Sequence, residues 1–286
     1  MPDADAARTN PAAPLTIRSL TTADAIRPLE DLQYRVWGFD PVEVVPLHVL
    51  LTAARHGGSL LGAYRRDRMV GFAFGFRGTD LDGTPALCSH LLAVDPDARG
   101  AGVAIALKHA QRSHALADGI RRVVWTFDPL EHGNARLNLA RLAGRTDRYL
   151  TDLYGPLRDT LNAGLPTDRL EVVWDLNDSD VVAACARADG VRPAPVGGFG
   201  PLLDPDGPGG GIDDPAGAPA VRLAAPADAQ ALRTRDPDAA LAWRLHLREG
   251  MTRLFGAGYV AVSAGFGPED PEYRFVRSGA GAPEPG

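Results

Sequence analysis

The chain has few of the features that mark membrane, secreted or metal-binding proteins. It contains two cysteines, Cys88 and Cys185, with no Cys-x-x-Cys pair, so neither a disulfide framework nor a cysteine-based zinc site is expected. No stretch reaches the roughly 18 consecutive apolar residues of a membrane span, and the first fourteen residues include acidic residues and no apolar segment. We therefore expect a cytoplasmic protein with no membrane partner and no metal.

Positive charge is also scarce. The chain has 30 Lys and Arg residues against 36 Asp and Glu residues, a formal net charge of -6, and its single lysine is Lys108. Nucleic-acid-binding domains usually carry a clustered positive excess that neutralises phosphates, so a nucleic-acid partner is not expected. The apolar share of 45% and the charged share of 23% are close to the globular average and predict a packed core.

Glycine and proline, in contrast, are plentiful, with 32 and 24 residues. They are densest between Pro193 and Ala220, which predicts a linker or long surface loop without a core of its own. We expect a disordered tail over 1–14, an α/β domain over 15–177, a linker over 178–220 and an α+β appendage over 221–286. Because the appendage is small for independent folding, we expect it to dock on the larger domain or to complete a homodimer.

Hydrophobic periodicity predicts the order β-α-α-β-β-β-α-β-α-β-β for the larger domain, and hence a mixed, mostly antiparallel sheet flanked by helices. In one strand Val70, Phe72, Phe74 and Phe76 alternate with small residues, which predicts a single aromatic face. The predicted strands are 15–20, 59–64, 68–76, 85–96, 121–129, 147–154 and 169–176, the predicted helices are 28–37, 46–56, 102–119 and 133–143, and the appendage has strands at 220–225, 258–266 and 272–278 around a helix at 238–255.

The most informative stretch joins the strand that ends at Val94 to the helix after Gly102. Small residues at 100, 101, 102 and 104 leave backbone N–H groups uncovered at a helix N-terminus, which suits a phosphate or pyrophosphate. A Walker loop would need Gly-Lys-Ser/Thr, and a dinucleotide fingerprint would need a small residue where Ile105 stands. A tight strand–helix connection without a ligand remains the alternative.

This turn, written Arg99-x-x-Gly102-x-Ala104, resembles the Gln/Arg-x-x-Gly-x-Gly/Ala phosphate turn of the GNAT superfamily of acyl-CoA N-acyltransferases. The likeness covers roughly Leu15 to Leu176 and includes the order of the elements. More narrowly, the chain looks like a bacterial GNAT subgroup with a C-terminal extension. The residues that carry this narrower likeness are Ser89-His90, Lys108, Gln111-Arg112, Trp125 to Leu130, Asn134, Asn138, Tyr154-Gly155, Gly164 to Arg169, Trp174, Trp243-Arg244, Arg248 and Gly258-Tyr259.

The resemblance implies acetyl-CoA or another acyl-CoA as co-substrate. Strands 87–94 and 123–127 would splay apart around the pantetheine arm, and an N–H near Leu92 would polarise the thioester carbonyl. The backbone of Gly100 to Ala104 would hold the pyrophosphate. The cofactor-binding residues that it implies are Leu92, Ala93, Val94, Arg99, Gly100, Ala101, Gly102, Val103, Ala104 and Asn134.

The catalytic acid and base are less well marked. The superfamily often has a tyrosine seven residues after the asparagine of the last helix, and here that position holds Arg141. Tyr149 and Tyr154 are the substitutes, unless their phenols only pack and hydrogen-bond. For the base we favour His90, because an imidazole titrates near neutrality; a structural histidine with water as the base is the alternative.

Two further sets of polar residues admit a functional interpretation. Asp128, at the end of a strand, could orient an ammonium group or simply open a turn. Arg244 and Arg248 lie four residues apart on one helix and could bind a carboxylate, but we interpret them as a solvated face opposite the apolar stripe of Trp243.

The sequence thus predicts an N-acyltransferase that moves a short acyl group to the amine of a small metabolite such as an amino acid. The first alternative is a non-catalytic CoA-binding or sensing module, suggested by the missing tyrosine. A weaker one is a nucleotide-binding oxidoreductase.

Overall fold

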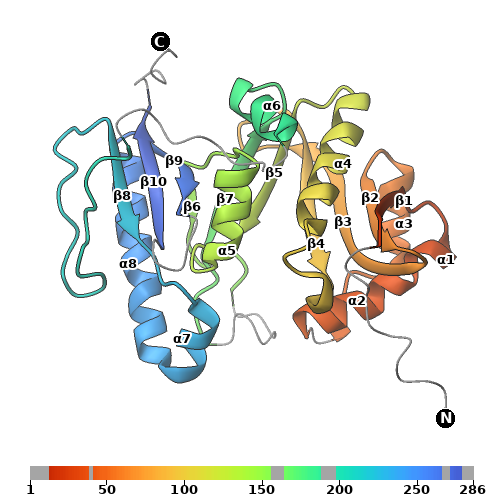
Figure 1. Cartoon of the computed structure of the whole chain (residues 1–286), viewed down its shortest axis with the longest axis horizontal. Coiled ribbons are helices and arrows are strands. Elements are labelled where there is room, and N and C mark those ends of the chain that lie inside the picture. The colour runs from red at the N-terminus through yellow and green to blue at the C-terminus, as the bar shows by residue number, and fades with distance from the viewer. Residues whose placement is uncertain (1–12, 39–40, 156–163, 188–197, 266–270, 279–286) are drawn as a thin grey trace. The chain divides into compact units, whose positions relative to one another are not determined.

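The computed structural model describes residues 13–38, 41–155, 164–187, 198–265 and 271–278. Nearly all of the predicted tail, and residues 188–197 of the predicted linker, lie outside the described residues. The chain forms two compact units that meet in the sequence between Val124 and Trp125, within one strand. Each unit is described separately, and Figure 1 gives the element labels.

The first unit contains the first four strands, the start of the fifth, and the helices between them. The predicted elements form in the predicted order, and each boundary lies within about two residues of its expected place except the end of β3. The short helix α1 and two 3-10 turns are additional. The bounds are β1 Leu15–Ser19, α1 Ala23–Ile26, α2 Pro28–Trp37, the 3-10 turn η1 Pro41–Glu43, α3 Leu47–Arg55, β2 Ser59–Arg65, β3 Arg68–Thr79, β4 Pro85–Val94, the 3-10 turn η2 Pro96–Ala98, α4 Val103–Ala117 and β5 Arg122–Phe127.

Local chemistry accounts for the helix ends. Pro28 occupies the first turn of α2, where its missing N–H costs nothing, and Gly38 ends that helix in the left-handed conformation with φ 61°. The strands are hydrogen-bonded in the order β1-β2-β3-β4-β5. The pairs β1–β2, β2–β3 and β3–β4 are antiparallel and β4–β5 is parallel, which confirms the mixed, mostly antiparallel sheet.

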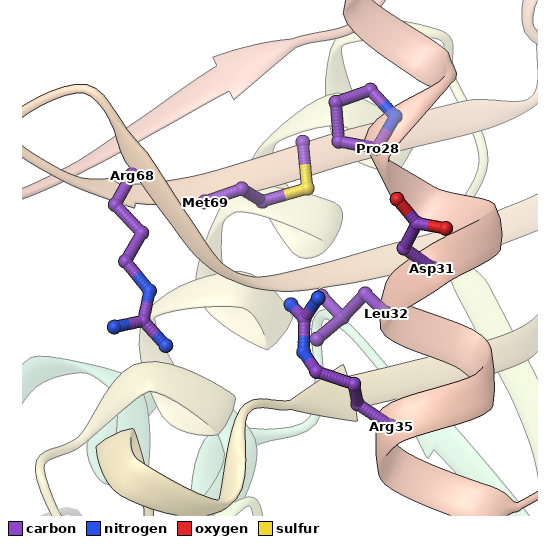
Figure 2. A pocket seen from close by; sticks show the side chains of 6 residues that line it. All are labelled: Pro28, Asp31, Leu32, Arg35, Arg68 and Met69. Atoms are coloured by element: carbon purple, nitrogen blue, oxygen red, sulfur yellow. The ribbon is translucent and has the colours of Figure 1, made fainter. Parts of the chain in front are cut away.

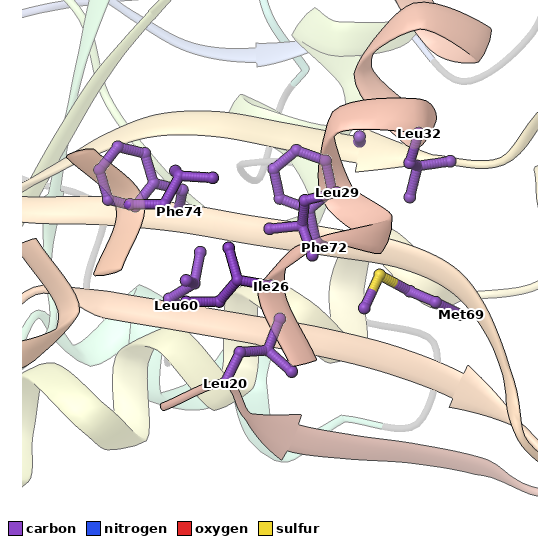
Figure 3. Packing of buried hydrophobic residues seen from close by; sticks show 10 residues of the cluster. Leu20, Ile26, Leu29, Leu32, Leu60, Met69, Phe72 and Phe74 are labelled. Carbon is purple, nitrogen blue, oxygen red and sulfur yellow. The ribbon is translucent and has the colours of Figure 1, made fainter. Parts of the chain in front are cut away.

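One face of this sheet packs against α2 and α3. Phe72 and Phe74 of β3 lie beneath Leu29 and Leu32 of α2, with Leu60 of β2 beside them, and all five are buried (Figure 3). Burying side chains of this size stabilises the fold by roughly 1.5–3 kcal/mol each relative to leaving them in water. This cluster fixes β3, which is the strand next to the candidate site.

The other face packs against α4 through Val103 and Leu107. Val70 belongs to this face, so the prediction of one aromatic face through positions 70, 72, 74 and 76 was wrong at its first residue. The reason is a register shift opposite Ala63 and Tyr64, where β3 carries one extra residue and the alternation of sides changes.

The second unit contains the rest of β5, two strands that continue from it, and a separate three-stranded sheet. Its strands are ordered β5-β7-β6 and β8-β10-β9. The bounds are α5 His132–Ala135, the π-helical segment η3 Arg136–Arg141, β6 Tyr149–Leu150, β7 Arg169–Asp175, α6 Ser179–Ala186, β8 Ala220–Ala224, α7 Ala229–Arg235, α8 Pro237–Gly256, β9 Tyr259–Ala264 and β10 Glu272–Arg277.

The C-terminal elements are tied by hydrogen bonds to earlier segments of this same unit. The Tyr273 hydroxyl donates to the carbonyl of Pro129 at 2.7 Å, and Thr146 exchanges two backbone hydrogen bonds with Ala261 at 3.1 and 2.8 Å. Trp174, fully buried, donates its indole N–H to Leu142. A small α+β piece therefore shares the core of its neighbours instead of forming one alone.

The predicted linker contains more structure than its composition indicates. Residues 179–186 form helix α6, with Val181 and Ala184 buried. Further on, Leu203 is buried and the Asp204 carboxylate lies 2.6 Å from Nε2 of His246. Glycine and proline shape this segment's turns, but Asp204 still has a partner on α8, His246.

The described helices include none long and apolar enough to cross a bilayer. Among the same residues, no three His, Cys, Asp or Glu side chains are grouped so as to hold a metal ion.

Candidate functional site

The turn between β4 and α4 has the geometry that an anion site needs. Gly100 and Gly102 both have positive φ, 76° and 77°, and a Cβ built on either would meet no atom within 4 Å. In the turn, the backbone N–H groups of Ala98 and Arg99 donate to Asp95 and Pro96, and that of Ala106 donates to Gly102. The N–H groups of residues 100–102 take no part in these bonds. The exposed N-terminus of the fifteen-residue helix α4 is thus open to a phosphate.

Asp95 holds the base of this turn. It is 3% exposed, its Oδ1 accepts the N–H of Asp97, and its Oδ2 lies 3.4 Å from Arg35 and 3.1 Å from Arg68. The two arginines also line a pocket of about 380 Å³ with Pro28, Asp31, Leu32 and Met69, into which they point from α2 and β3 (Figure 2). Because Asp95 already engages both guanidinium groups, we assign them to holding the turn.

Strand β4 changes its pairing just before the turn. Its parallel ladder with β5 covers two residue pairs, Leu87–Val123 and Cys88–Val124. Across from β3 the register shifts, since Phe74 pairs with Leu91 while Gly75 pairs with Ser89. His90 is therefore the extra residue of a β-bulge, a feature that bends a strand and re-aims its side chains.

His90 is exposed and lies against two aromatic rings, with its centroid 6.0 Å from those of both Phe74 and Phe76. Partial burial in this aromatic setting lowers the pKa of His90 below its usual value near 6.5. The imidazole is accordingly neutral at pH 7 and able to accept a proton, which agrees with the base role predicted for it and does not test it.

The two candidate tyrosines have different surroundings. Tyr149, in β6, donates its hydroxyl to Asp168 at 2.7 Å, and burial together with this carboxylate raises its pKa far above the usual value. Tyr154 lies in the turn after β6 and not on a strand as predicted; it is 49% exposed, and its hydroxyl is 3.0 Å from that of Thr126. Of the two, Tyr154 has the phenol that can more easily exchange a proton with a substrate.

The predicted helix at 133–143 forms, but it winds partly as a π-helix. Leu142 donates to the carbonyl of Leu137, five residues earlier, instead of following the α-helical ladder. Asn134 and Arg141 are both exposed. The position where the superfamily often has a tyrosine thus presents a guanidinium group at the surface.

Arg244 and Arg248 do not form the solvated face that we predicted for them. Arg244 is 1% exposed and donates to Asp128 at 2.8 Å, while Arg248 binds both oxygens of Asp168 at 2.8 Å. Burial alone would raise the pKa of Asp168, but the hydrogen bonds from Arg248 and Tyr149 outweigh it and hold that pKa below its usual value. Asp128 likewise accepts hydrogen bonds from arginine side chains, Arg233 and Arg244. This role is structural, and it differs from the binding of a substrate ammonium group.

The sequence did not indicate that Asp95 and Lys108 are buried and hydrogen-bonded. Asp95 and Lys108 are ordinary in composition and spacing, and only the fold shows that each is nearly inaccessible and hydrogen-bonded from several elements. The signal available was that Lys108 is the single lysine of the chain. It shares the buried face of α4 with Gln111 and with the apolar residues Val103, Leu107 and Ala115.

Comparison with known proteins gives one family match. Residues 23–142 match the model of the acetyltransferase (GNAT) family. A search of curated proteins found no match.

Solved structures give weaker likenesses. The ribosomal-protein-S18-alanine N-acetyltransferase of Escherichia coli is 15% identical, with a TM-score of 0.44 over 57% of this chain and 94% of its own. An N-acetyltransferase of Staphylococcus aureus is 16% identical, with a TM-score of 0.45 over 57% of this chain and 99% of its own. We base the assignment on the family model and not on these structures.

The segment 23–142 is a GNAT acetyltransferase domain. A domain of this family supports N-acyltransferase activity with an acyl-CoA as co-substrate. The open glycine turn at the start of α4 fits the pyrophosphate of that co-substrate, because its backbone donors face outward with no side chain over them.

Proposed function

We propose that the protein transfers an acetyl or other short acyl group from acyl-CoA to the amine of a small metabolite such as an amino acid. The observation that carries the proposal is the turn of residues 99–104, which combines two glycines of positive φ, open space above them and the N-terminus of α4. Acyl-CoA supplies the activated thioester. The chain supplies the binding and the proton transfers.

In this proposal the backbone of Gly100 to Ala104, with Arg99 beside it, holds the pyrophosphate, and Asn134 also contacts the co-substrate. The main chain of Leu92, Ala93 and Val94 lies along the pantetheine arm. This edge of β4 follows the two-residue ladder with β5, and within the described part of the first unit no strand pairs with it on that side, which leaves its hydrogen-bonding groups available.

For the proton transfers we propose His90 as the base that deprotonates the attacking amine and Tyr154 as the acid for the departing thiolate, with Tyr149 as the second candidate. The lowered pKa of His90 keeps its imidazole neutral near pH 7, the state in which it accepts a proton. The half-exposed side chain of Tyr154 supports its role over that of Tyr149, whose hydroxyl donates to Asp168.

The test is release of free thiol from acetyl-CoA and succinyl-CoA in the presence of amino acids, polyamines and short peptides, with the acylated product confirmed by mass. The peptides are included because the similar E. coli enzyme is named for acetylating a protein alanine. We expect amine-dependent thiol release with a small amine. Acylation of peptides alone would contradict the small acceptor, and CoA binding with no transfer to any amine would favour the non-catalytic CoA-binding module.

A further inference from the structure

A chain of buried polar side chains links α4 to the bulge of β4. Lys108 donates from Nζ to the Ser89 hydroxyl at 2.8 Å and to Oε1 of Gln111 at 3.2 Å, and Gln111 donates from Nε2 to the hydroxyl of Ser59 at 3.1 Å. The exposed fractions of these four residues are 1%, 7%, 0% and 0%. We call this set of four residues the Lys108 chain.

The Lys108 chain is costly to build. An ammonium group loses its hydration on burial, and this loss lowers the pKa of Lys108 to about 7. A methionine of similar length would fill the same space between α4 and the sheet without that cost. Stability of the core therefore does not explain a lysine at position 108.

The neighbouring strand is also shaped for the Lys108 chain. Gly75 of β3 stands opposite it, and a Cβ there would lie 3.1 Å from Nε2 of Gln111 and 3.2 Å from the hydroxyl of Ser59. Any side chain at position 75 would press on the amide that joins Lys108 to Ser59. The glycine leaves room for this hydrogen-bonded arrangement.

The Lys108 chain ends at the bulge. Ser89 and His90 are adjacent, and the register of β4 against β3 shifts between Ser89 and Leu91, so that His90 is the unpaired residue. Ser89 bonds to α4 on one face of the sheet, while His90 contacts Phe74 and Phe76, of which Phe74 belongs to the core cluster on the other face. A bulged residue has no ladder bonds of its own, so its neighbours must fix its orientation.

We propose that Lys108 is a positioning residue for His90: by holding Ser89 from the side of α4, it fixes the bulge of β4 and with it the direction of the imidazole. This proposal rests on the proposed function only in giving His90 the role of base. The orientation of His90 is a property of the fold and can be measured without turnover.

The test uses Lys108→Met and Ser89→Ala in the full chain, with Leu107→Ala as the matched control. Leu107 is also fully buried on α4 and packs on the same sheet face, but it is no part of the Lys108 chain. The imidazole NMR signals of His90, identified among those of the seven histidines by their loss in His90→Gln, report its surroundings. Amine-dependent kcat and the Kd for CoA are measured alongside.

We expect the His90 signals to shift in both test variants and not in Leu107→Ala. In the two test variants kcat should fall roughly tenfold, because small misplacements of a catalytic group are expensive, while the Kd for CoA stays within about twofold. Leu107→Ala should lower the melting temperature and leave kcat within about twofold.

The proposal would be overturned if the His90 signals and kcat were unchanged in a folded Lys108→Met or Ser89→Ala variant. Should Lys108→Met not fold, Ser89→Ala decides the proposal alone. If the wild type shows no turnover, shifted His90 signals in the test variants would sustain the positioning role and refute only the proposed function.

Discussion

At the scale of single residues, the account depends most on His90. Its side chain type and its place on a strand before the turn were readable from the sequence, but the bulge that presents it was not. A bulge depends on how two strands pair over several residues, and the residue types around Ser89 and Gly75 do not indicate one.

The pH dependence of kcat/KM tests the base. Because the pKa of His90 lies below its usual value near 6.5, the active neutral form persists at pH 7 and is lost as the pH falls through that pKa. We expect activity to decline on the acidic side with this single titration. His90→Gln should lower kcat by on the order of 10²–10⁴ and remove that acidic limb. An intact limb in His90→Gln would instead favour water as the base.

The arginines of α8 show why one residue-scale prediction failed. A pair of arginines four residues apart on a helix is most often solvated, so the sequence favoured an exposed face. Their partners, Asp128 and Asp168, lie more than seventy residues earlier, and nothing in the spacing connects them. Contacts of this range are decided by the fold.

At the scale of elements, the strand and helix order of the first unit was predictable because each element carries its own signals. Period-two alternation marks most of β3, Pro28 and Gly38 bound α2, and glycines separate β4 from α4. The π-helical segment and the two-residue strand β6 were not predictable, since both depend on tertiary packing of short segments.

The turn before α4 gives the element-scale prediction. Asp95→Asn keeps an oxygen that can accept from the N–H of Asp97 but removes the charge that Arg35 and Arg68 share. We expect the free energy of unfolding in urea to fall by about 1–2 kcal/mol, because hydrogen bonds to charged groups contribute on this scale and both arginines stay partly solvated.

Asp97→Asn is the control for this measurement. Asp97 is 68% exposed and lies 3.8 Å from Arg68, so its loss should change stability by less than about 0.5 kcal/mol. Equal effects of the two substitutions would show that Asp95 does not anchor the turn.

At the scale of the whole molecule, the predicted division of the chain followed its glycine and proline content, while the structure groups residues by contact. Contacts divide it inside β5, and residues of the predicted linker pack with the second unit, as Leu203 and the Asp204–His246 pair show. Composition reports how a segment turns, while a few side chains decide what it packs against. The homodimer and the cytoplasmic location stay predictions.

The central claim is that the turn at the start of α4 binds the pyrophosphate of an acyl-CoA within a GNAT acetyltransferase domain. Gly102→Glu would place a carboxylate where the pyrophosphate binds. Gly119→Glu is its matched control, since Gly119 also has a positive φ, 74°, and open space around it, but stands at the opposite end of the same helix. Both substitutions carry the same kind of backbone strain, so a difference between them reports the site.

Calorimetric titration of CoA into the full chain measures this directly. We expect the wild type and Gly119→Glu to bind with the same Kd and folded Gly102→Glu to show no binding. Wild-type affinity in Gly102→Glu, or no CoA binding by the wild type, would contradict the account.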